Sequence, residues 1–296
     1  MPTIQNDLLS IDIKTVGAEL CKISAINNNN QFLWHADPNV WGSHAPNLFP
    51  IIGSMKDDSY IYKNKLYNMT KHGFVRHNDK MIVKQQSETS ITFFLNSNED
   101  LYEIFPFLFE FEINYELKDN TIIVNHTIRN IDDKTMYFSL GGHPAFTCPL
   151  FEDDAYSDYF LEFEKEETSE SYLLNMKTGL VTNKTKSVFD SPNTINLRGD
   201  LFNEDALIFK DLKSRKVALK HKTNGEILSV IFEDFPYLGI WAKPNAPYVC
   251  IEPWLGVADT EDTNQKIEEK EGIVTLKPKK SLEASYKIIL NRNLLN

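Results

Sequence analysis

The stretch from Val217 to Phe232, VALKHKTNGEILSVIF, gives the clearest indication of the fold. Two runs rich in β-branched and other apolar residues, Val217–His221 and Ile227–Phe232, lie on either side of Asn224-Gly225. An Asn-Gly pair between such runs is typical of a β-hairpin, because both residues tolerate the positive φ that a tight turn requires. We therefore expect two antiparallel strands joined by a short turn.

Strand-like runs extend outward from this hairpin over most of the chain. They alternate apolar and polar residues or carry β-branched and aromatic residues, and turn residues separate them. The further runs that we expect to form strands are Leu8–Lys14, Thr121–Arg129, Ala206–Lys210, Tyr237–Lys243, Tyr248–Glu252 and Ser281–Leu290. Helical periodicity is confined to short pieces near Ser97–Tyr102 and Asn264–Lys270. This pattern predicts an all-β fold, a large antiparallel sandwich or barrel, and we expect residues 1–296 to form a single domain.

The net charge and the N-terminal sequence limit the kinds of partner and the cellular location that we expect. The 296 residues include 31 basic and 42 acidic side chains, a net charge of −11. Nucleic acids and anionic membranes attract basic surfaces, so we expect neither as a partner, and the charge weighs mildly against a highly phosphorylated ligand. The first residues lack the basic and apolar regions of a signal peptide, and no apolar run is long enough to span a membrane. We expect a cytoplasmic monomer or homodimer.

The cysteines and the absence of common motifs restrict the chemistry. Cys21, Cys148 and Cys250 lie far apart, and such a sparse, odd set indicates neither a disulfide framework nor a zinc site. Phosphate-binding, dinucleotide-binding, nucleophile-elbow and H-E-x-x-H motifs are absent from the sequence. Acid–base chemistry by histidine and carboxylate side chains, or ligand binding alone, are the functions left to consider, and we expect no metal or organic cofactor.

Glu252 is the first candidate for acid–base chemistry. On a strand that begins at Tyr248, alternation places Tyr248, Cys250 and Glu252 on one face. Pro253 is expected to end this strand or to lie where it reaches an edge of the sheet, because proline cannot donate to a β-ladder. Glu252 would then lie beside the indole of Trp254, where partial loss of water raises the pKa of a carboxyl and makes it a better base. An exposed glutamate at a strand end is the alternative.

His143 is the second candidate. It follows Gly141-Gly142, which allow the backbone to approach another group closely, and it precedes Pro144, which fixes the direction of the chain. An imidazole on such a bend, with an unperturbed pKa near about 6.5, can give and take protons at neutral pH. A hydrogen-bonded histidine with a structural role would show the same pattern.

The segment KHGFVR, residues 71–76, could bind a ligand. On an extended segment His72, Phe74 and Arg76 lie on one face. The guanidinium of Arg76 offers donors in a fixed fork that suits pairs of sugar hydroxyls, and the Phe74 ring would serve as a platform for sugar C–H groups. A salt bridge at the rim of a pocket is the alternative.

Asp205 is a weaker candidate for ligand binding. It precedes the predicted strand at residues 206–210, and an aspartate in that place is often only a turn acceptor. Glu204 competes with it for any acidic role.

Three of these segments resemble, in this order, the signatures of one family. His72-Gly-Phe-Val-Arg76, Gly-Gly-His143-Pro-Ala-Phe and Cys-Ile-Glu252-Pro-Trp are similar to motifs of the aldose 1-epimerase (galactose mutarotase-like) family, and look closest to its LacX-like branch. The resemblance extends from the N-terminal strands to the last predicted strand. It implies a single large β-sandwich, often called a supersandwich, with a sugar bound in a cleft on one sheet.

The resemblance also implies residue roles. The catalytic histidine and glutamate of the family fall on His143 and Glu252, and its sugar-binding arginine and aspartate fall on Arg76 and Asp205. His72 corresponds to a second binding histidine that lies on a differently spaced motif in galactose mutarotases. The implied activity is the interconversion of the α and β anomers of an aldohexose without a cofactor.

In that reaction Glu252 would remove the proton of the C1 hydroxyl while protonated His143 donates to the ring oxygen. We therefore expect the two side-chain ends to face each other across a cleft, on the order of 5–7 Å apart, with Trp254 and Phe74 at its border. A hexose-phosphate mutarotase and a non-catalytic sugar-binding protein on the same fold are alternatives. The basic residues that could serve the first are Lys71, Arg76, His77 and Lys80. A glycoside hydrolase would need two flanking carboxylates, and only Glu252 is well placed.

Overall fold

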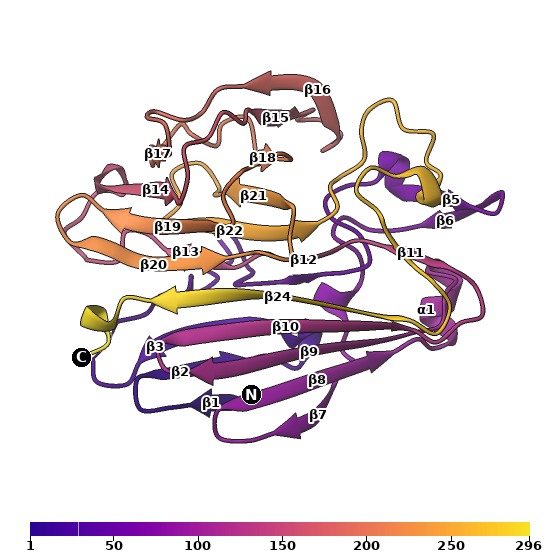
Figure 1. Cartoon of the computed structure of the whole chain (residues 1–296), viewed down its shortest axis with the longest axis horizontal. Helices are drawn as coiled ribbons and strands as arrows, with labels where there is room; N and C mark the ends of the chain where they lie inside the picture. The colour runs from indigo at the N-terminus through magenta and orange to yellow at the C-terminus, as the bar shows by residue number, and fades with distance from the viewer. Residues whose placement is uncertain (29) are drawn as a thin grey trace.

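Two large antiparallel sheets form most of the computed structural model, which describes residues 1–28 and 30–296 (Figure 1). The first sheet consists of nine strands in the spatial order β17 (Thr194–Asn196), β14 (Tyr159–Phe163), β19 (Lys216–His221), β20 (Gly225–Ile231), β24 (Ser281–Leu290), β10 (Thr121–Asn130), β9 (Phe109–Lys118), β8 (Ser90–Asn96) and β7 (Ile82–Gln86). In Figure 1 this sheet rises from β7 at the bottom through β24 to β14. Strand β24 therefore joins β10, from the first half of the chain, to β20, from the second.

The second sheet carries the site described below. Its strands follow the spatial order β16 (Val181–Lys186), β15 (Ser171–Leu174), β18 (Leu207–Phe209), β21 (Tyr237–Trp241), β22 (Tyr248–Leu255), β12 (Leu140–Gly142) and β4 (Asn47–Leu48), and β13 (Ala145–Thr147) also pairs with β22. These two sheets confirm the predicted all-β antiparallel sandwich.

Smaller elements complete the fold. Three short sheets are formed by β1 (Thr3–Gln5), β2 (Leu9–Ile13) and β3 (Leu20–Ala25), by β5 (Ser59–Tyr62) and β6 (Lys65–Asn68), and by β11 (Met136–Phe138) and β23 (Val274–Leu276). The helical elements are α1 (Glu99–Ile104) and the 3₁₀ turns η1 (Val16–Ala18), η2 (Lys56–Asp58), η3 (Val75–His77), η4 (Tyr156–Asp158), η5 (Ile267–Glu269) and η6 (Arg292–Leu294). None of the helices in the described ranges has both the length and the apolar character needed to cross a membrane.

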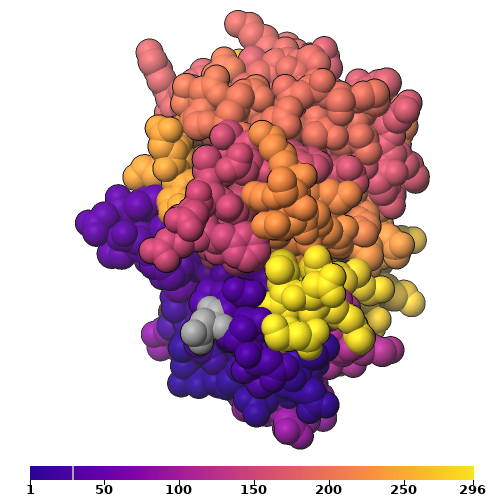
Figure 2. Space-filling model, turned by 90° about the vertical axis from the view of Figure 1, so that its left-hand side faces the viewer, coloured from indigo at the N-terminus to yellow at the C-terminus, as the bar shows by residue number. Residues whose placement is uncertain are grey.

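The C-terminal residues lie against the N-terminal part of the chain. Figure 2 shows the yellow C-terminal segment in contact with the indigo N-terminal segment. The side-chain amides of Asn28 and Asn30 both donate to the Leu294 carbonyl oxygen. These bonds fix the end of the chain beside β3.

The hairpin at residues 217–232 forms as expected. β19 and β20 pair antiparallel, Gly225 has a φ of 77°, and the ring nitrogen Nδ1 of His221 accepts from the N–H groups of Thr223 and Asn224. Residues 222–224 connect the two strands, which is longer than a two-residue turn, and a β-bulge shifts the register between Leu219 and Lys220. The two short helical predictions correspond to α1 and η5.

The long strands follow the alternation that their sequences predict. β9 and β10 alternate buried and half-buried residues, since one face packs on the core and the other faces solvent. β22 differs, because every residue from Tyr248 to Trp254 is buried. Core side chains cover one face of this strand, and the walls of the site cover the other.

The expectation that the strand ends or reaches an edge at Pro253 is wrong, because β22 continues to Leu255 and lies between β21 and β12. The N–H of Ile251 donates to Pro144, which lies between β12 and β13. The nitrogen of Pro253, two residues further along, faces the same side. In the register of these strands Pro253 lies opposite Gly142, the last residue of β12. Its missing N–H therefore costs at most the final hydrogen bond of the ladder between β12 and β22.

A buried ion pair holds the segment that follows β22. The Lys270 ammonium lies 2.6 Å from the Asp259 carboxylate, and both side chains are 2% exposed. The second carboxylate oxygen of Asp259 accepts from the N–H of Lys56. The pair therefore ties η5 to the chain beside Ala258, which lines the site.

We predict that Lys270→Met lowers the free energy of unfolding by about 3–5 kcal/mol, because it leaves the Asp259 carboxylate buried without its partner. Urea unfolding measures the change. Lys266→Met is the matched control, since Lys266 forms an exposed ion pair with Glu269 near the same turn and such pairs contribute little. Equal stability of both variants and the wild type would contradict this account.

Candidate active site

The pairing of β22 with β12 and β13 places His143 opposite Glu252. Leu140 and Gly141 of β12 pair with Leu255 and Trp254, and Ala145 of β13 pairs with Cys250. Both short strands therefore keep one register with β22, and in that register His143 faces Glu252. Directly opposed residues of an antiparallel pair extend their side chains on the same face. The Gly-Gly-His-Pro segment and the Cys-Ile-Glu segment thus form one unit.

The two side chains are in direct contact. Nε2 of His143 lies 3.3 Å from Oε2 of Glu252. The expected separation of 5–7 Å is wrong, because residues opposed in a β-ladder have Cβ atoms only about 4.5–5.5 Å apart and are not separated by a cleft. His143 is 7% exposed and Glu252 is 1% exposed.

The pair lies in the wall of a pocket of about 190 Å³. That volume is below the roughly 300–1,000 Å³ typical of sites for drug-sized ligands, so it suits a small molecule. Four of the five predicted binding residues line the same pocket: His72, Arg76, Asp205 and Trp254. The backbone of Gly141 approaches the Trp254 indole so closely that a Cβ there would lie 2.8 Å from the ring, which explains why glycine occupies this position.

Phe74 does not line this pocket, and the prediction of a sugar platform at Phe74 is wrong. Its ring packs against Phe49, Phe105 and Phe109 at the edge of the core. The segment is not extended, because His72 and Gly73 have positive φ and residues 75–77 form η3. This turn sends Phe74 toward the core and brings His72 and Arg76 to the pocket.

His72 is oriented by Gly53. The Gly53 N–H donates to Nδ1 of His72, and the His72 N–H donates to the Gly53 carbonyl oxygen. Because Nδ1 accepts, the neutral ring carries its proton on Nε2. Burial lowers the pKa of His72 well below its usual value, and the neighbouring His143 lowers it further. His72 therefore offers an N–H donor without a charge.

Asp205, not Glu204, is the carboxylate of the pocket. Asp205 has a φ of 70°, and one of its carboxylate oxygens accepts from the N–H of Ala206. Glu204 points elsewhere and forms an ion pair with Lys186. Arg76 is partly buried, and burial lowers its pKa, although Glu19 and Glu252 oppose that shift.

Of the other residues that line the pocket, Trp41 and Trp241 carry large aromatic side chains and were not predicted, and Lys71 was named only for a possible phosphate site. The Trp41 ring stacks on the His143 ring, with centroids 5.0 Å apart and an interplanar angle of 27°. Trp241 meets the same imidazole nearly at right angles, at 5.8 Å. The loop Asp37-Pro-Asn-Val-Trp41-Gly offered a signal for Trp41, since a tryptophan among turn residues is often a binding group. Trp241 lies within a strand and has no comparable signal.

Burial dominates the electrostatics of the acid–base pair. It lowers the pKa of His143 to about 3, and the positive charges of Arg76 and Lys71 act in the same direction. Burial also raises the pKa of Glu252 well above its usual value, although Lys71 opposes this. Both shifts favour the uncharged forms of the two side chains.

Several polar atoms of the pocket have no hydrogen-bond partner within the described ranges. They include Nε of Arg76, Nε1 of Trp254 and Oε2 of Glu252, all of them buried. Buried polar atoms are nearly always paired in folded proteins. Donors and an acceptor that converge unpaired on one pocket are typical of a site for a polar ligand.

One group of side chains in the described part of the chain could also hold a metal ion. The ligand atoms of His143, Cys250 and Glu252 lie within 4.8 Å of one another. All three residues are buried, and Cys250 lies two residues before Glu252 on the same face of β22. Histidine, thiolate and carboxylate ligands together would suit zinc better than magnesium or calcium.

Comparison with known proteins shows the family of the chain. The family model for aldose 1-epimerase matches residues 2–288. The chain belongs to the aldose 1-epimerase family. The LacX protein of Lactococcus lactis subsp. lactis is 33% identical, over 97% of this chain and 99% of its own length.

Solved structures of relatives share the fold. The galactose mutarotase related enzyme from Lactobacillus acidophilus is 36% identical with a TM-score of 0.92, and the match covers 98% of this chain and 97% of that one. A galactose mutarotase-like protein from Lactobacillus casei is 30% identical, also with a TM-score of 0.92, over 98% of this chain and 100% of that one. This aldose 1-epimerase family member thus has the galactose mutarotase-like sandwich.

We predict that Glu252→Gln makes the protein more stable at neutral and alkaline pH. The pKa of Glu252 is raised in the folded state, so the wild type loses stability as the pH rises from about 4.3, the ordinary glutamate value, toward the folded pKa. The gain should grow by about 1.4 kcal/mol for each pH unit across that window.

Urea unfolding of both proteins between pH 4 and pH 9 measures this difference. At the acid end the two proteins should be nearly equally stable, because a protonated carboxyl and an amide are similar in shape and polarity. A constant difference at all pH values would show that the Glu252 carboxyl does not titrate abnormally.

Proposed function

We propose that this protein is an aldose 1-epimerase that interconverts the α and β anomers of a neutral aldohexose, with Glu252 as base and His143 as acid. The observation that carries the proposal is the buried contact of 3.3 Å between these two side chains in the wall of a small polar pocket. Membership of the aldose 1-epimerase family supports a sugar substrate. Pure binding would not require a buried acid–base pair, which costs stability.

The reaction needs one titratable proton on the pair formed by Glu252 and His143. With the proton on Glu252 both side chains are neutral, and transfer across the contact gives a carboxylate and an imidazolium. Lys71 and Arg76 favour the carboxylate, since both lower the pKa of Glu252. The reactive, charged form therefore has the same proton count as the neutral resting form.

Ring opening then requires two proton transfers. The Glu252 carboxylate takes the proton of the C1 hydroxyl, and the His143 imidazolium gives a proton to the ring oxygen as the C1–O5 bond breaks. Rotation about C1–C2 presents the other face of the aldehyde. Ring closure reverses both transfers, so the pair ends as it began.

The polar groups of the pocket suit the hydroxyl groups of a sugar. Two cations, Lys71 and Arg76, line it together with two carboxyl groups, those of Asp205 and Glu252. Asp205 and Arg76 can bind ring hydroxyls as acceptor and donor. The flat faces of Trp41 and Trp241 offer apolar surface to the C–H groups of the sugar. This is the role that was predicted for Phe74.

We predict that the wild type accelerates the change in optical rotation of freshly dissolved α-anomers, with a bell-shaped pH dependence. Glu252→Gln and His143→Asn should each lower kcat by roughly 10²–10⁴-fold. The double variant should lose little more than either single one, because the two residues act together. Polarimetry over a panel of aldoses measures the rates.

Arg76→Ala is the matched contrast for these two variants. Its hydrogen bonds to ring hydroxyls exist in the ground state and the transition state alike, so KM should rise more than kcat falls. Sugar binding by a wild type that never accelerates anomer exchange would favour the non-catalytic sugar-binding protein. Near wild-type rates in Glu252→Gln would refute the mechanism.

We further predict that a neutral aldose binds at least as tightly as its 6-phosphate, because the pocket has few basic residues and the whole protein carries a charge of −11. Calorimetric titration of both ligands measures this. A clear preference for the phosphate would favour the hexose-phosphate mutarotase.

A further inference from the structure

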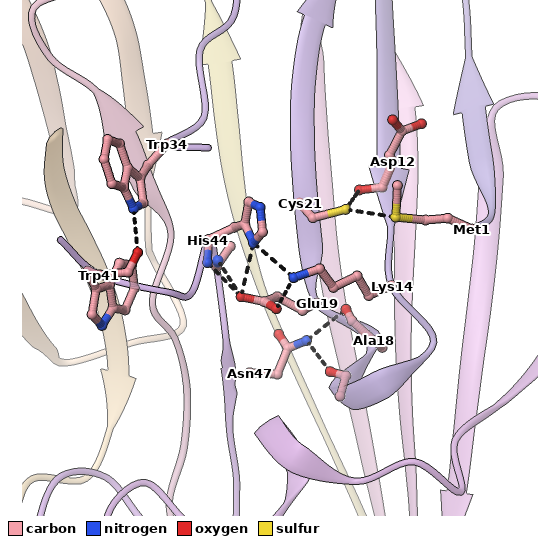
Figure 3. Close-up of polar contacts among 12 residues, drawn as sticks. Met1, Asp12, Lys14, Ala18, Glu19, Cys21, Trp34, Trp41, His44 and Asn47 are labelled. Carbon is pink, nitrogen blue, oxygen red and sulfur yellow. Dashed lines mark hydrogen bonds and ion pairs between the residues drawn. The ribbon is translucent and has the colours of Figure 1, made fainter. Parts of the chain in front are cut away.

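A buried carboxylate outside the pocket holds the chain segment that supports the site. Glu19 is 9% exposed and follows η1. One of its oxygens accepts from the backbone N–H groups of His44, at 2.7 Å, and of Ala45, at 3.2 Å (Figure 3). The ammonium of Lys14 lies 3.3 Å from the other oxygen and 3.2 Å from Nδ1 of His44. Glu19 thus fixes residues 44–45 through two backbone bonds and one bridging charge.

The segment held by Glu19 in turn binds the backbone on both sides of the acid. The N–H of His143 donates to the Pro46 carbonyl oxygen, and the N–H of Ala145 donates to the His44 carbonyl oxygen. Only one residue, Ala45, separates these two acceptors, and Ala45 is itself bound to Glu19. The carboxylate of Glu19 is therefore two hydrogen-bonded steps from the backbone of His143.

The same segment leads directly to Trp41. The indole of Trp34 donates to the Trp41 carbonyl oxygen, and the N–H of Trp41 donates to Asp37. These bonds hold the loop before Trp41, and the bonds from Glu19 to residues 44–45 hold the chain after it (Figure 3). Between these anchors the Trp41 ring stacks on His143.

The turn that carries Glu19 also packs against η3. Gly17 has a φ of 65°, and a Cβ at this position would lie 2.7 Å from the Arg76 carbonyl oxygen. The N–H of Gly17 donates to the Asn78 carbonyl oxygen at 2.9 Å. Residues 16–19 thus contact the backbone of Arg76 directly, and they support the backbone of His143 through residues 44–46.

We propose that Glu19 is a positioning residue for this site, which sets His143 and Trp41 through the backbone of residues 44–46. The inference rests on the proposed function, since it assigns Glu19 a role in placing the acid. Glu19 touches neither the pocket nor Glu252. Its pKa is lowered to about 2: burial alone would raise it, but the hydrogen bonds from His44 and the charge of Lys14 outweigh burial. Glu19 is therefore a permanent acceptor at every pH at which the enzyme would work.

Two substitutions separate this role from a general contribution to stability. Glu19→Ala removes the acceptor for both N–H groups and should lower kcat by roughly 10–100-fold, because small misplacements of a reacting group have effects of that size. Glu19→Gln keeps an oxygen for the two N–H groups and should restore kcat to within about threefold of the wild type, since only the charge is lost. KM should change less than kcat in both variants.

Glu167→Ala is the matched control. Glu167 is also buried and also accepts from two successive backbone N–H groups, those of Lys213 and Ser214. It lies outside the pocket and contacts neither residues 44–46 nor His143. Its loss should lower the thermal midpoint about as much as Glu19→Ala does and leave kcat unchanged. Equal loss of kcat in both variants would show that Glu19 acts only through stability.

A spectroscopic readout tests the placement without turnover. The ring-current field of Trp41 should displace the Cε1–H proton resonance of His143, which is assigned by its loss in His143→Asn, and Trp41→Leu gives the position without the stack. In Glu19→Ala the resonance should move toward the Trp41→Leu position, and in Glu19→Gln it should stay at the wild-type position. An unmoved resonance and unchanged kcat in Glu19→Ala would overturn the proposal.

Lys14→Met serves if Glu19→Ala does not fold. It removes the ammonium that contacts both Glu19 and His44, and it should move the His143 resonance in the same direction by a smaller amount. No movement in Lys14→Met would overturn the proposal. If the wild type fails to accelerate anomer exchange, the proposed function fails, while the resonance of His143 still decides whether Glu19 places it.

Discussion

The register between β22 and the interrupted strand β12–β13 is the constraint on which the site depends. It sets His143 opposite Glu252, and a shift by one residue would turn one of the two side chains to the other face of the sheet. The neighbouring elements reinforce this register. Pro253 lies opposite Gly142 at the end of β12, Gly141 leaves room for the Trp254 indole, and Pro46 accepts from the His143 N–H. The walls of the pocket, which come from distant parts of the chain, are assembled around a pair that the sheet has already fixed.

The same register explains why the site lowers the stability of the fold. A histidine and a glutamate in direct contact and almost without solvent lose the hydration that would stabilise their charges. The large core of the sandwich offsets this cost, with aromatic rings such as Phe49 and Phe109 packed between the sheets. Under the proposed function, sugar hydroxyls pair with the buried polar atoms of the pocket that have no partner within the described residues. On that proposal stability and chemistry oppose each other at Glu252, whereas the buried charge of Lys270 serves the fold.

Much of the fold was predictable because local patterns and tertiary pairing agree. The strand at Ser281–Leu290 has the expected bounds, and the Asn224-Gly225 hairpin forms with a bulge. Of the residues that line the pocket, the three sequence motifs contain His72, Arg76, His143, Glu252 and Trp254, whereas Asp205 lies in none of them. The predicted separation of the acid–base pair was wrong, because motifs along the chain do not reveal which positions oppose each other across a ladder. Phe74 was misplaced because two residues of positive φ turn its segment, and neither was identifiable as such from the sequence.

The place of β24 in the first sheet has a consequence for biosynthesis. This strand lies between β10 and β20 and is made after every other strand of the two sheets. Until it leaves the ribosome, β10 and β20 both present long unpaired edges, which are templates for pairing with other chains. The pairing of Thr121 with Ile289 also joins residues far apart in the sequence, and contacts of that kind slow folding. The nascent protein is therefore prone to aggregation until β24 has paired with β10 and β20. Bacterial expression at lower temperature or with chaperones should raise the yield of folded protein.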